Sequence, residues 1–282
     1  MRLPAVAGRF YPDDPDELER MLSWCFSHPM GPGEPERTGS ERRIAAAMAP
    51  HAGYMCSGMT AARTYRAIQE DGLPEVYVVI GPDHYGTTGG ANVVCPDDFL
   101  TPLGVCRTDG EVCARLSEHM PADASVHRWE HAIEVQVPFI QRMDPDTAVV
   151  GITMGDQSPA SAADLASAIR DACADRDAMV IASTDMSHYI PKQEAARLDG
   201  MVLGDVGRMD VRGMYRTVFG NRVSMCGYGP TAVAMLFAGD AEAEVLAHTD
   251  SDDALATGPS EVVGYASAVF RGPGSRRPRF NI

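Results

Sequence analysis

The segment Val76-Tyr77-Val78-Val79-Ile80-Gly81-Pro82-Asp83-His84 decides the fold of this chain. Its first five residues are apolar with no polar alternation, as in a strand that is buried on both faces. A Gly-Pro turn then fixes the direction of the chain, and a histidine follows it. The segment therefore predicts a central strand of a parallel sheet, with a chemically useful side chain at its carboxyl end.

Apolar runs of the same kind recur along the chain, and segments of helical character separate them. The clearest helix starts at Asp14-Pro15-Asp16-Glu17, which supplies an N-cap, a proline at the first helical position and an acidic third residue. The predicted strands are 44–49, 76–80, 148–153, 179–183, 245–248 and 262–270, and the other predicted helices are 59–70, 110–120, 160–174, 192–208 and 231–238. This order predicts a layered α/β fold around a largely parallel central sheet.

The composition is that of a globular protein. The chain has 282 residues, of which 45% are apolar and 22% charged, so disorder, collagen and coiled coil are excluded. Since α/β folds of roughly this length are often one domain, we expect a single domain over residues 1–282. Residues 28–43 should form a surface loop and residues 272–282 a tail.

The charge balance excludes several partners. The 24 basic and 39 acidic residues give a net charge of −15, which repels nucleic-acid phosphates and anionic membranes. No apolar run is long enough to span a membrane and the first residues lack a secretory core, so we expect a cytoplasmic location. Lys192 is the one lysine, which removes the P-loop motif. Seven cysteines without a Cys-x-x-Cys pair indicate neither a disulfide framework nor a zinc knuckle.

Three histidines directly follow predicted strands. They are His51, His84 and His188, each set in a turn after an apolar run. The ligand crevice of an open α/β sheet lies outside the carboxyl ends of its strands, so these side chains should converge there although they are far apart in sequence. An isolated loop histidine is more often only hydrogen-bonded or exposed, but three at one rim indicate a site.

Acidic residues accompany two of the histidines. Asp185 lies three residues before His188, close enough on a turn to orient the ring or to share a ligand position, although it could also be a helix N-cap. His131 lies between Glu130 and Glu134, in an order that differs from the metalloprotease motif. If this segment is helical, the two glutamates share one face, which is either solvated or functional.

Cys226 lies in the Gly-rich segment Ser224-Met225-Cys226-Gly227-Tyr228-Gly229-Pro230, just before an apolar helix. A helix N-terminus stabilises a thiolate, which would make this residue a nucleophile or a metal ligand. The same segment weakly matches a dinucleotide fingerprint. The alternative is an inert buried cysteine, as we expect for the other six.

Five ordered motifs together resemble the Memo family (mediator of cell motility). The motifs are Pro50-His51-Ala52-Gly53-Tyr54, Gly81-Pro82-Asp83-His84, Glu130-His131-Ala132-Ile133-Glu134, Ser183-Thr184-Asp185-Met186-Ser187-His188 and Met225-Cys226-Gly227. The resemblance extends from Pro4 to Phe270, nearly the whole chain. It implies a fold like that of class III extradiol dioxygenases and a metal site formed by His51, His84 and Cys226.

The resemblance also implies that His188 and Asp185 line the pocket in which the dioxygenases keep their acid–base histidine. Those enzymes hold iron(II) with two histidines and a carboxylate, whereas a thiol would be the third ligand here. A thiolate favours copper or zinc or shifts the potential of iron, so catechol cleavage does not follow. Family members are linked with radical-SAM and AMMECR-type proteins.

Two functions follow as hypotheses. In the first, His51, His84 and Cys226 hold iron(II) or copper, with zinc as another candidate, in a non-haem oxidoreductase. His188 would move a proton, Asp185 would set its tautomer, and His131 is a further candidate catalytic residue. In the second, the cleft binds a peptide or protein without catalysis, using aromatic residues such as Tyr54, Tyr85 and Tyr228. In both, a small molecule or peptide occupies the cleft.

Overall fold

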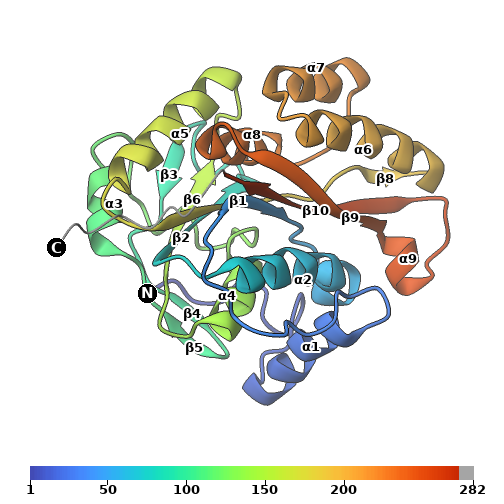
Figure 1. The fold of residues 1–282 in the computed structure, drawn as a ribbon, viewed down its shortest axis with the longest axis horizontal. Coiled ribbons are helices and arrows are strands. Elements are labelled where there is room, and N and C mark those ends of the chain that lie inside the picture. Colours follow the sequence, from blue (N-terminus) through green and yellow to red (C-terminus); the bar gives the residue numbers. More distant parts are fainter. Residues whose placement is uncertain (273–282) are drawn as a thin grey trace.

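The computed structural model describes residues 1–272 and shows a central sheet between two layers of helices (Figure 1). The strands are β1 (Ile44–Ala49), β2 (Val76–Pro82), β3 (Asn92–Val94), β4 (Phe99–Thr101), β5 (Gly104–Cys106), β6 (Ala148–Met154), β7 (Ala178–Ser183), β8 (His188–Ile190), β9 (Glu242–Asp250) and β10 (Val262–Arg271). The α-helices are α1 (Pro15–Ser27), α2 (Tyr54–Asp71), α3 (Gly110–Leu116), α4 (Val137–Met143), α5 (Pro159–Ala172), α6 (Lys192–Gly207), α7 (Val211–Asn221), α8 (Tyr228–Ala238) and α9 (Ser251–Leu255), with a 3-10 turn η1 (Glu134–Gln136).

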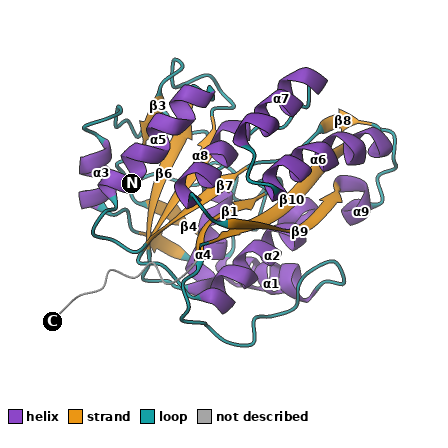
Figure 2. Ribbon diagram, turned by 45° about the horizontal axis from the view of Figure 1, so that its top comes forward, coloured by secondary structure: helices purple, strands orange, loops and turns teal. Residues whose placement is uncertain are grey.

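The main sheet has the order β3-β6-β2-β7-β1-β10-β8, and β9 pairs with β10. Its four central strands, β6, β2, β7 and β1, are parallel. β3 and β10 run antiparallel to their neighbours at the two flanks. The predicted α/β fold with a largely parallel central sheet is therefore confirmed, and Figure 2 shows the strands fanning out between the helices.

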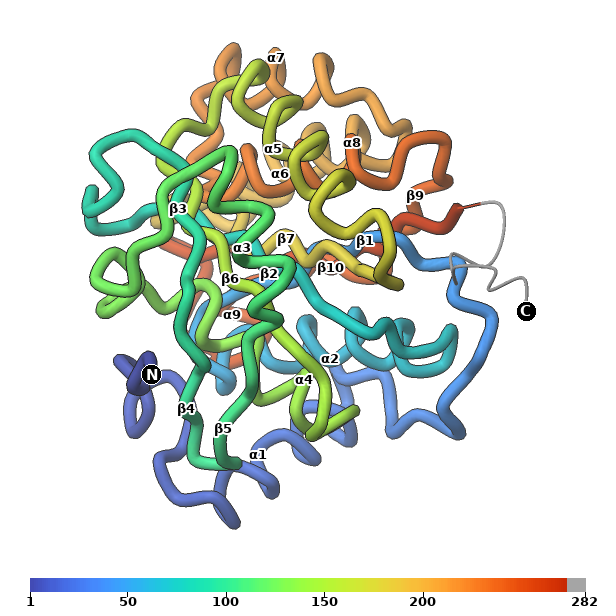
Figure 3. The backbone as a smooth tube through the Cα atoms, turned by 90° about the vertical axis from the view of Figure 1, so that its left-hand side faces the viewer, coloured from blue at the N-terminus to red at the C-terminus, as the bar shows by residue number. Residues whose placement is uncertain are grey.

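Each face of the sheet packs against its own layer of helices. One core contains Val78 and Ile80 of β2 together with residues of α3, α5, α6, α7 and α8. The other contains Tyr77 and Val79 of the same strand with residues of α1, α2 and α4. Because successive side chains of a strand point to opposite faces, a strand between two cores has no polar position. Figure 3 shows the same layers from the side.

The predicted elements match the observed ones to within a few residues at their ends, but some elements were not predicted. The N-cap of α1 is Asp14, whose carboxylate accepts a hydrogen bond from the amide of Glu17 at 2.9 Å. The unpredicted elements are α4, α7, α9, η1, β3, β4, β5 and β8. Residues 28–43 contain no helix or strand, as predicted, whereas most of the expected tail, 273–282, lies outside the described residues.

A buried ion pair closes the amino edge of the sheet. Arg42, just before β1, donates from Nε to Oδ2 of Asp177, just before β7, at 2.9 Å. Its Nη1 donates to the carbonyl of Ile44 at 2.7 Å, and the amide of Ile44 donates to Asp71 Oδ2 at 2.7 Å. All the polar groups in this cluster are therefore engaged with one another.

Across residues 1–272, no helix combines the length and the apolar character needed to cross a membrane.

Candidate metal centre

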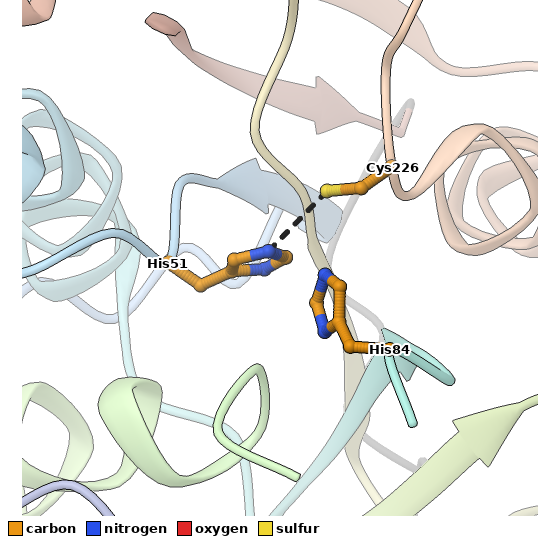
Figure 4. Close-up of side chains that lie close together, drawn as sticks. All are labelled: His51, His84 and Cys226. Carbon is orange, nitrogen blue, oxygen red and sulfur yellow. Dashed lines mark hydrogen bonds between the residues drawn. The ribbon is translucent and has the colours of Figure 1, made fainter. Parts of the chain in front are cut away.

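Three neighbouring parallel strands carry the candidate site. β2, β7 and β1 lie side by side, so the loops that follow them meet at the carboxyl edge of the sheet. His51 lies two residues after β1, His84 two residues after β2 and Asp185 two residues after β7. Cys226 comes from a distant part of the chain, immediately before the N-cap of α8. Figure 4 shows the side chains of His51, His84 and Cys226 pointing toward one another.

The three residues predicted as metal ligands are close enough to share an ion. The sulfur of Cys226 is 3.3 Å from Nε2 of His51. One ligand atom from each of His51, His84 and Cys226 lies within 4.8 Å of the other two. In a tetrahedral site with metal–nitrogen bonds of about 2.0 Å and metal–sulfur bonds of about 2.3 Å, ligand atoms are roughly 3.5 Å apart. Small side-chain movements would therefore complete the coordination.

A hydrogen-bond network around Ser183 fixes the tautomer of His51. The Ser183 hydroxyl donates to the carbonyl of Ala132 at 2.6 Å, so its oxygen must accept from its other partners. Those partners are Nε2 of Gln136 at 2.8 Å and Nδ1 of His51 at 3.0 Å. The proton of His51 is therefore on Nδ1, and the lone pair of Nε2 faces Cys226.

Glu130 performs the same function for His84. Its Oε1 is 2.8 Å from Nδ1 of His84, and its Oε2 accepts the backbone amide of the same residue at 2.8 Å. Oε1 also accepts the amide of Ala132 at 2.9 Å. Because an ionised carboxylate can only accept, Nδ1 of His84 carries a proton and Nε2 is free for a metal.

Burial controls the protonation of these groups. Burial lowers the pKa of His51 to about 3, helped by the charge of His84, and burial lowers the pKa of His131 to about 4. At Glu130 burial acts to raise the pKa, but the hydrogen bond from His84 and the charge of that ring outweigh it and lower the pKa to about 2. At His84, burial is likewise outweighed by Glu130, which raises the pKa of the imidazole.

The Cys226 thiol is protonated in the absence of a metal. Burial raises the pKa of the thiol, and the Asp185 carboxylate adds to this shift, although the amide of Asp185 donates to Sγ at 3.2 Å. The prediction that the helix N-terminus makes this residue a thiolate is therefore wrong for the metal-free chain, since burial dominates over the helix dipole. A bound metal would displace the proton.

Asp185 and His188 line the site but are not paired as predicted. Oδ1 of Asp185 accepts the backbone amide of His51 at 2.8 Å, and burial raises the pKa of this carboxyl. Nδ1 of His188 is 2.8 Å from the carbonyl of Ser224, which can only accept. Ser224, and not Asp185, therefore orients the His188 ring and keeps a proton on its Nδ1.

His131 packs against the two histidines of the candidate metal site. Its ring is stacked on His84 with centroids 4.7 Å apart and meets His51 edge-on at 5.4 Å. On its other side the ring of Phe10 approaches to 4.9 Å. His131 therefore contacts the candidate metal site and the N-terminal segment of the chain at once.

Glu134 holds that N-terminal segment in place. The carboxylate accepts from the amide of Ala5 at 2.8 Å, the amide of Val6 at 3.0 Å and the hydroxyl of Tyr11 at 2.6 Å, and it also pairs with Arg2. Both Glu130 and Glu134 are almost fully buried, so the alternative of a solvated acidic face is wrong.

A pocket of about 390 Å³ opens beside the cluster, within the size range of small-molecule sites. Its lining residues are Phe10, His51, Ala52, Gly53, His84, His131, Asp185, His188, Tyr189, Val263 and Tyr265. The tyrosines predicted to line a cleft, Tyr54, Tyr85 and Tyr228, are not among them. Tyr54 is buried and donates to the carbonyl of Val135 at 2.7 Å instead.

Several residues that hold the site in place were not given a role from the sequence. Ser183 and Gln136 fix His51 through side-chain contacts between distant segments, and Ser224 fixes His188 through a backbone carbonyl. Phe10 belongs to the N-terminal motif, but its contact with His131 depends on the fold. Of these, only Ser183 lies at a position that the strand pattern could have indicated, the last residue of β7.

The fold and the site define an α/β protein that gathers two histidines and a cysteine at the carboxyl edge of a parallel sheet. The chain belongs to the Memo-like family, whose family model matches residues 2–269. It is 40% identical to a MEMO1 family protein of Methanopyrus kandleri, with 96% of this chain and 99% of that protein covered. It is 41% identical to a MEMO1 family protein of Methanothermobacter thermautotrophicus, with 94% and 99% covered.

A solved structure shares the fold at a greater distance. The uncharacterized protein JW3007 of Escherichia coli K12 aligns with a TM-score of 0.50 and 14% sequence identity, over 80% of this chain and 100% of that one. This likeness concerns the fold alone.

Proposed function

We propose that this chain is a metal-binding redox protein that holds one iron or copper ion with Nε2 of His51, Nε2 of His84 and Sγ of Cys226. The observation that carries the proposal is the 3.3 Å approach of Cys226 Sγ to His51 Nε2, with His84 close to both. Three donors from three distant segments, two of them with their tautomers set for coordination, are more than packing requires.

The donor set fits a transition metal. Imidazole nitrogen suits iron, copper and zinc, and a thiolate sulfur favours copper(I) or zinc or shifts the potential of iron. Three protein ligands leave coordination positions open toward the pocket, as in a catalytic rather than a structural site. Bound there, such a metal would supply one-electron chemistry or polarise a ligand.

The other polar residues of the pocket would handle protons. The His188 ring is the proposed proton acceptor, because the hydrogen bond from Nδ1 to the carbonyl of Ser224 leaves Nε2 as the nitrogen that would take up a proton. One carboxylate oxygen of Asp185 accepts a hydrogen bond from the amide of His51. Asp185 also lines the pocket, where it would help to orient a ligand. His131, held neutral by burial, is a further proposed catalytic residue. Together they support a non-haem metal-dependent oxidoreductase.

Metal analysis of matched variants tests the proposal. Protein purified without oxygen should contain about one iron or copper per chain, because three donors define a single open site. His51→Ala and Cys226→Ala should lose most of this metal. Cys56→Ala is the control, since this half-buried thiol lies outside the cluster and its loss should leave the metal content unchanged.

Equal metal in the wild type and in all three variants would rule out this ligand set. Zinc in place of iron or copper would keep the ligands but remove the redox role, because zinc does not change its oxidation state.

The second candidate function is a non-catalytic module that binds a peptide or protein. The pocket supports it with the aromatic side chains of Phe10, Tyr189 and Tyr265. Capture of a partner that persists in His51→Ala and Cys226→Ala would favour this function. Radical-SAM and AMMECR-type proteins, which the resemblance implies as partners, are the first to test by co-purification.

A further inference from the structure

Cys226 lies in a turn that has no side-chain cap of its own. It precedes Gly227, the N-cap of α8, and a glycine N-cap has no side chain to accept the free amides of the first helical turn. Pro230 in the same turn has no amide at all. The position of the sulfur therefore depends on partners from elsewhere in the chain.

Thr184 Oγ1 accepts the amide of Gly227 at 2.9 Å and the carbonyl of Asp185 accepts the amide of Cys226 at 3.3 Å. Gln157, which follows β6, adds partners on both sides of the turn. Its Nε2 donates to the carbonyl of Cys226 at 2.9 Å. Its Oε1 accepts the amide of Gly229 at 2.8 Å, which is the capping bond that Gly227 lacks. One side chain therefore holds the residue before the N-cap and the first turn of the helix together.

The surroundings of Gln157 are tight. A Cβ atom on Gly229 would lie 2.7 Å from Cβ of Gln157 and 2.9 Å from Sδ of Met154, so only glycine allows this approach. The backbone carbonyl of Gln157 accepts the hydroxyl of Tyr215 in α7 at 2.9 Å. The Cβ atom and the backbone carbonyl of Gln157 are therefore held in place, which fixes the direction in which its side-chain amide extends toward Cys226.

We propose that Gln157 is a positioning residue for Cys226: it caps α8 from another element and thereby fixes the place of the sulfur relative to His51. Gln157 does not line the pocket and is not in the ligand cluster, so it acts only through Cys226. The proposal rests on the proposed metal site only for the spectroscopic test with a metal. The test on metal-free protein depends only on the contacts of the turn.

Cobalt(II) provides the first test, because it gives a charge-transfer band when a thiolate binds it. Gln157→Met should weaken cobalt binding by about 10- to 100-fold, as loss of an outer-sphere partner does, and should shift or weaken the sulfur band. The matched control is Gln141→Met. Gln141 is buried, whereas Gln157 is partly exposed, and it contacts Thr101 Oγ1 and Gly104 O outside the ligand cluster. Its loss should lower Tm but leave the band unchanged.

Gln157→Glu separates capping from positioning. The carboxylate can still accept from Gly229 and suits a helix N-terminus, so Tm should stay near that of the wild type. It cannot donate to the carbonyl of Cys226, so cobalt binding should weaken. A role limited to stability predicts the opposite, with unchanged metal binding in this variant.

Thiol alkylation of metal-free protein tests the positioning without any metal. Mass spectrometry would follow iodoacetamide at Cys226, and Gln157→Met should raise its rate several-fold over the wild type, whereas Gln141→Met should not. If the wild type shows no sulfur band but this rate still rises, the proposed metal site fails and the role of Gln157 stands. Unchanged alkylation rate and unchanged cobalt binding in Gln157→Met would overturn the inference.

Discussion

The two edges of the central sheet treat buried polar groups in opposite ways. At the amino edge, Arg42 before β1 and Asp177 before β7 bind each other and the adjacent backbone. At the carboxyl edge of the same two strands, Nδ1 of His51 and Oδ1 of Asp185 are each hydrogen-bonded within the protein. Nε2 of His51 meets only the sulfur of Cys226, at 3.3 Å, and both residues line the pocket.

This difference distinguishes polar side chains that stabilise the fold from polar side chains that can bind a ligand. A buried ion pair whose hydrogen bonds are complete holds strands in register, and removing one partner leaves an uncompensated charge. Histidines with one nitrogen bonded and the other free are positioned but unsaturated, which is what binding a ligand requires. The predictions below measure whether the two edges differ in this way.

The largest effect should come from breaking the amino edge. Arg42→Met should lower the free energy of unfolding by about 3–5 kcal/mol, because Asp177 remains buried without its partner. Cys226→Ala in metal-free protein should cost only about 1 kcal/mol. Urea denaturation measures both. Equal losses would mean that the two edges contribute alike to stability.

A change at Glu130 should have the next largest effect. Glu130→Gln keeps the size of the side chain but removes the charge that orients His84, so metal affinity should fall about 10- to 100-fold. Glu134→Gln is the matched control, since this carboxylate is equally buried but holds residues 2–11. It should reduce Tm more than metal affinity. The same loss of affinity in both variants would contradict the role given to Glu130.

The third comparison is the pH dependence of stability. The pKa is lowered to about 3 at His51 and to about 4 at His127 and His131, so in the folded state these rings stay mostly neutral as the pH falls from about 6.5 to about 5. The unfolded chain binds protons in this range, so stability must fall with pH, by up to about 1.4 kcal/mol per pH unit for each histidine.

Denaturation of metal-free protein at several pH values tests this dependence. His131→Gln should make the slope of the free energy of unfolding against pH shallower by the contribution of one histidine. A stability that stays constant between pH 6.5 and 4 would show that these rings are accessible to protons.

The strand pattern of the sequence was enough to predict the fold. Both faces of the sheet are buried, so its strands are long apolar runs such as 76–80. The sequence pattern was not enough to predict α7. That helix contains Gly213, Thr217 and Gly220, which are poor helix formers, and it is stabilised by the packing of Met214 and Val218. The buried residues Met214, Tyr215 and Val218 do recur at helical spacing, but the poor helix formers around them obscure the pattern.

The same limit applies to the site. The position after a strand end was sufficient to predict that His51 and His84 lie near each other, since the sheet brings such positions together. The partner of each ring nitrogen could not be predicted, because Ser183 and Glu130 reach the rings through three-dimensional contacts. The protonation of Cys226 was wrongly predicted because a helix N-terminus is visible in sequence, whereas burial is not.

The contacts of Glu134 have a consequence for the order in which the parts of the chain fold. The carboxylate is the common partner of Arg2, Val6 and Tyr11, so these contacts form only after Glu134, near the middle of the chain, has left the ribosome. This long loop must close before Phe10 can reach His131, which makes the docking of the N-terminal segment a late event in folding. Nascent chains that end before Glu134 should leave residues 2–11 open to proteases.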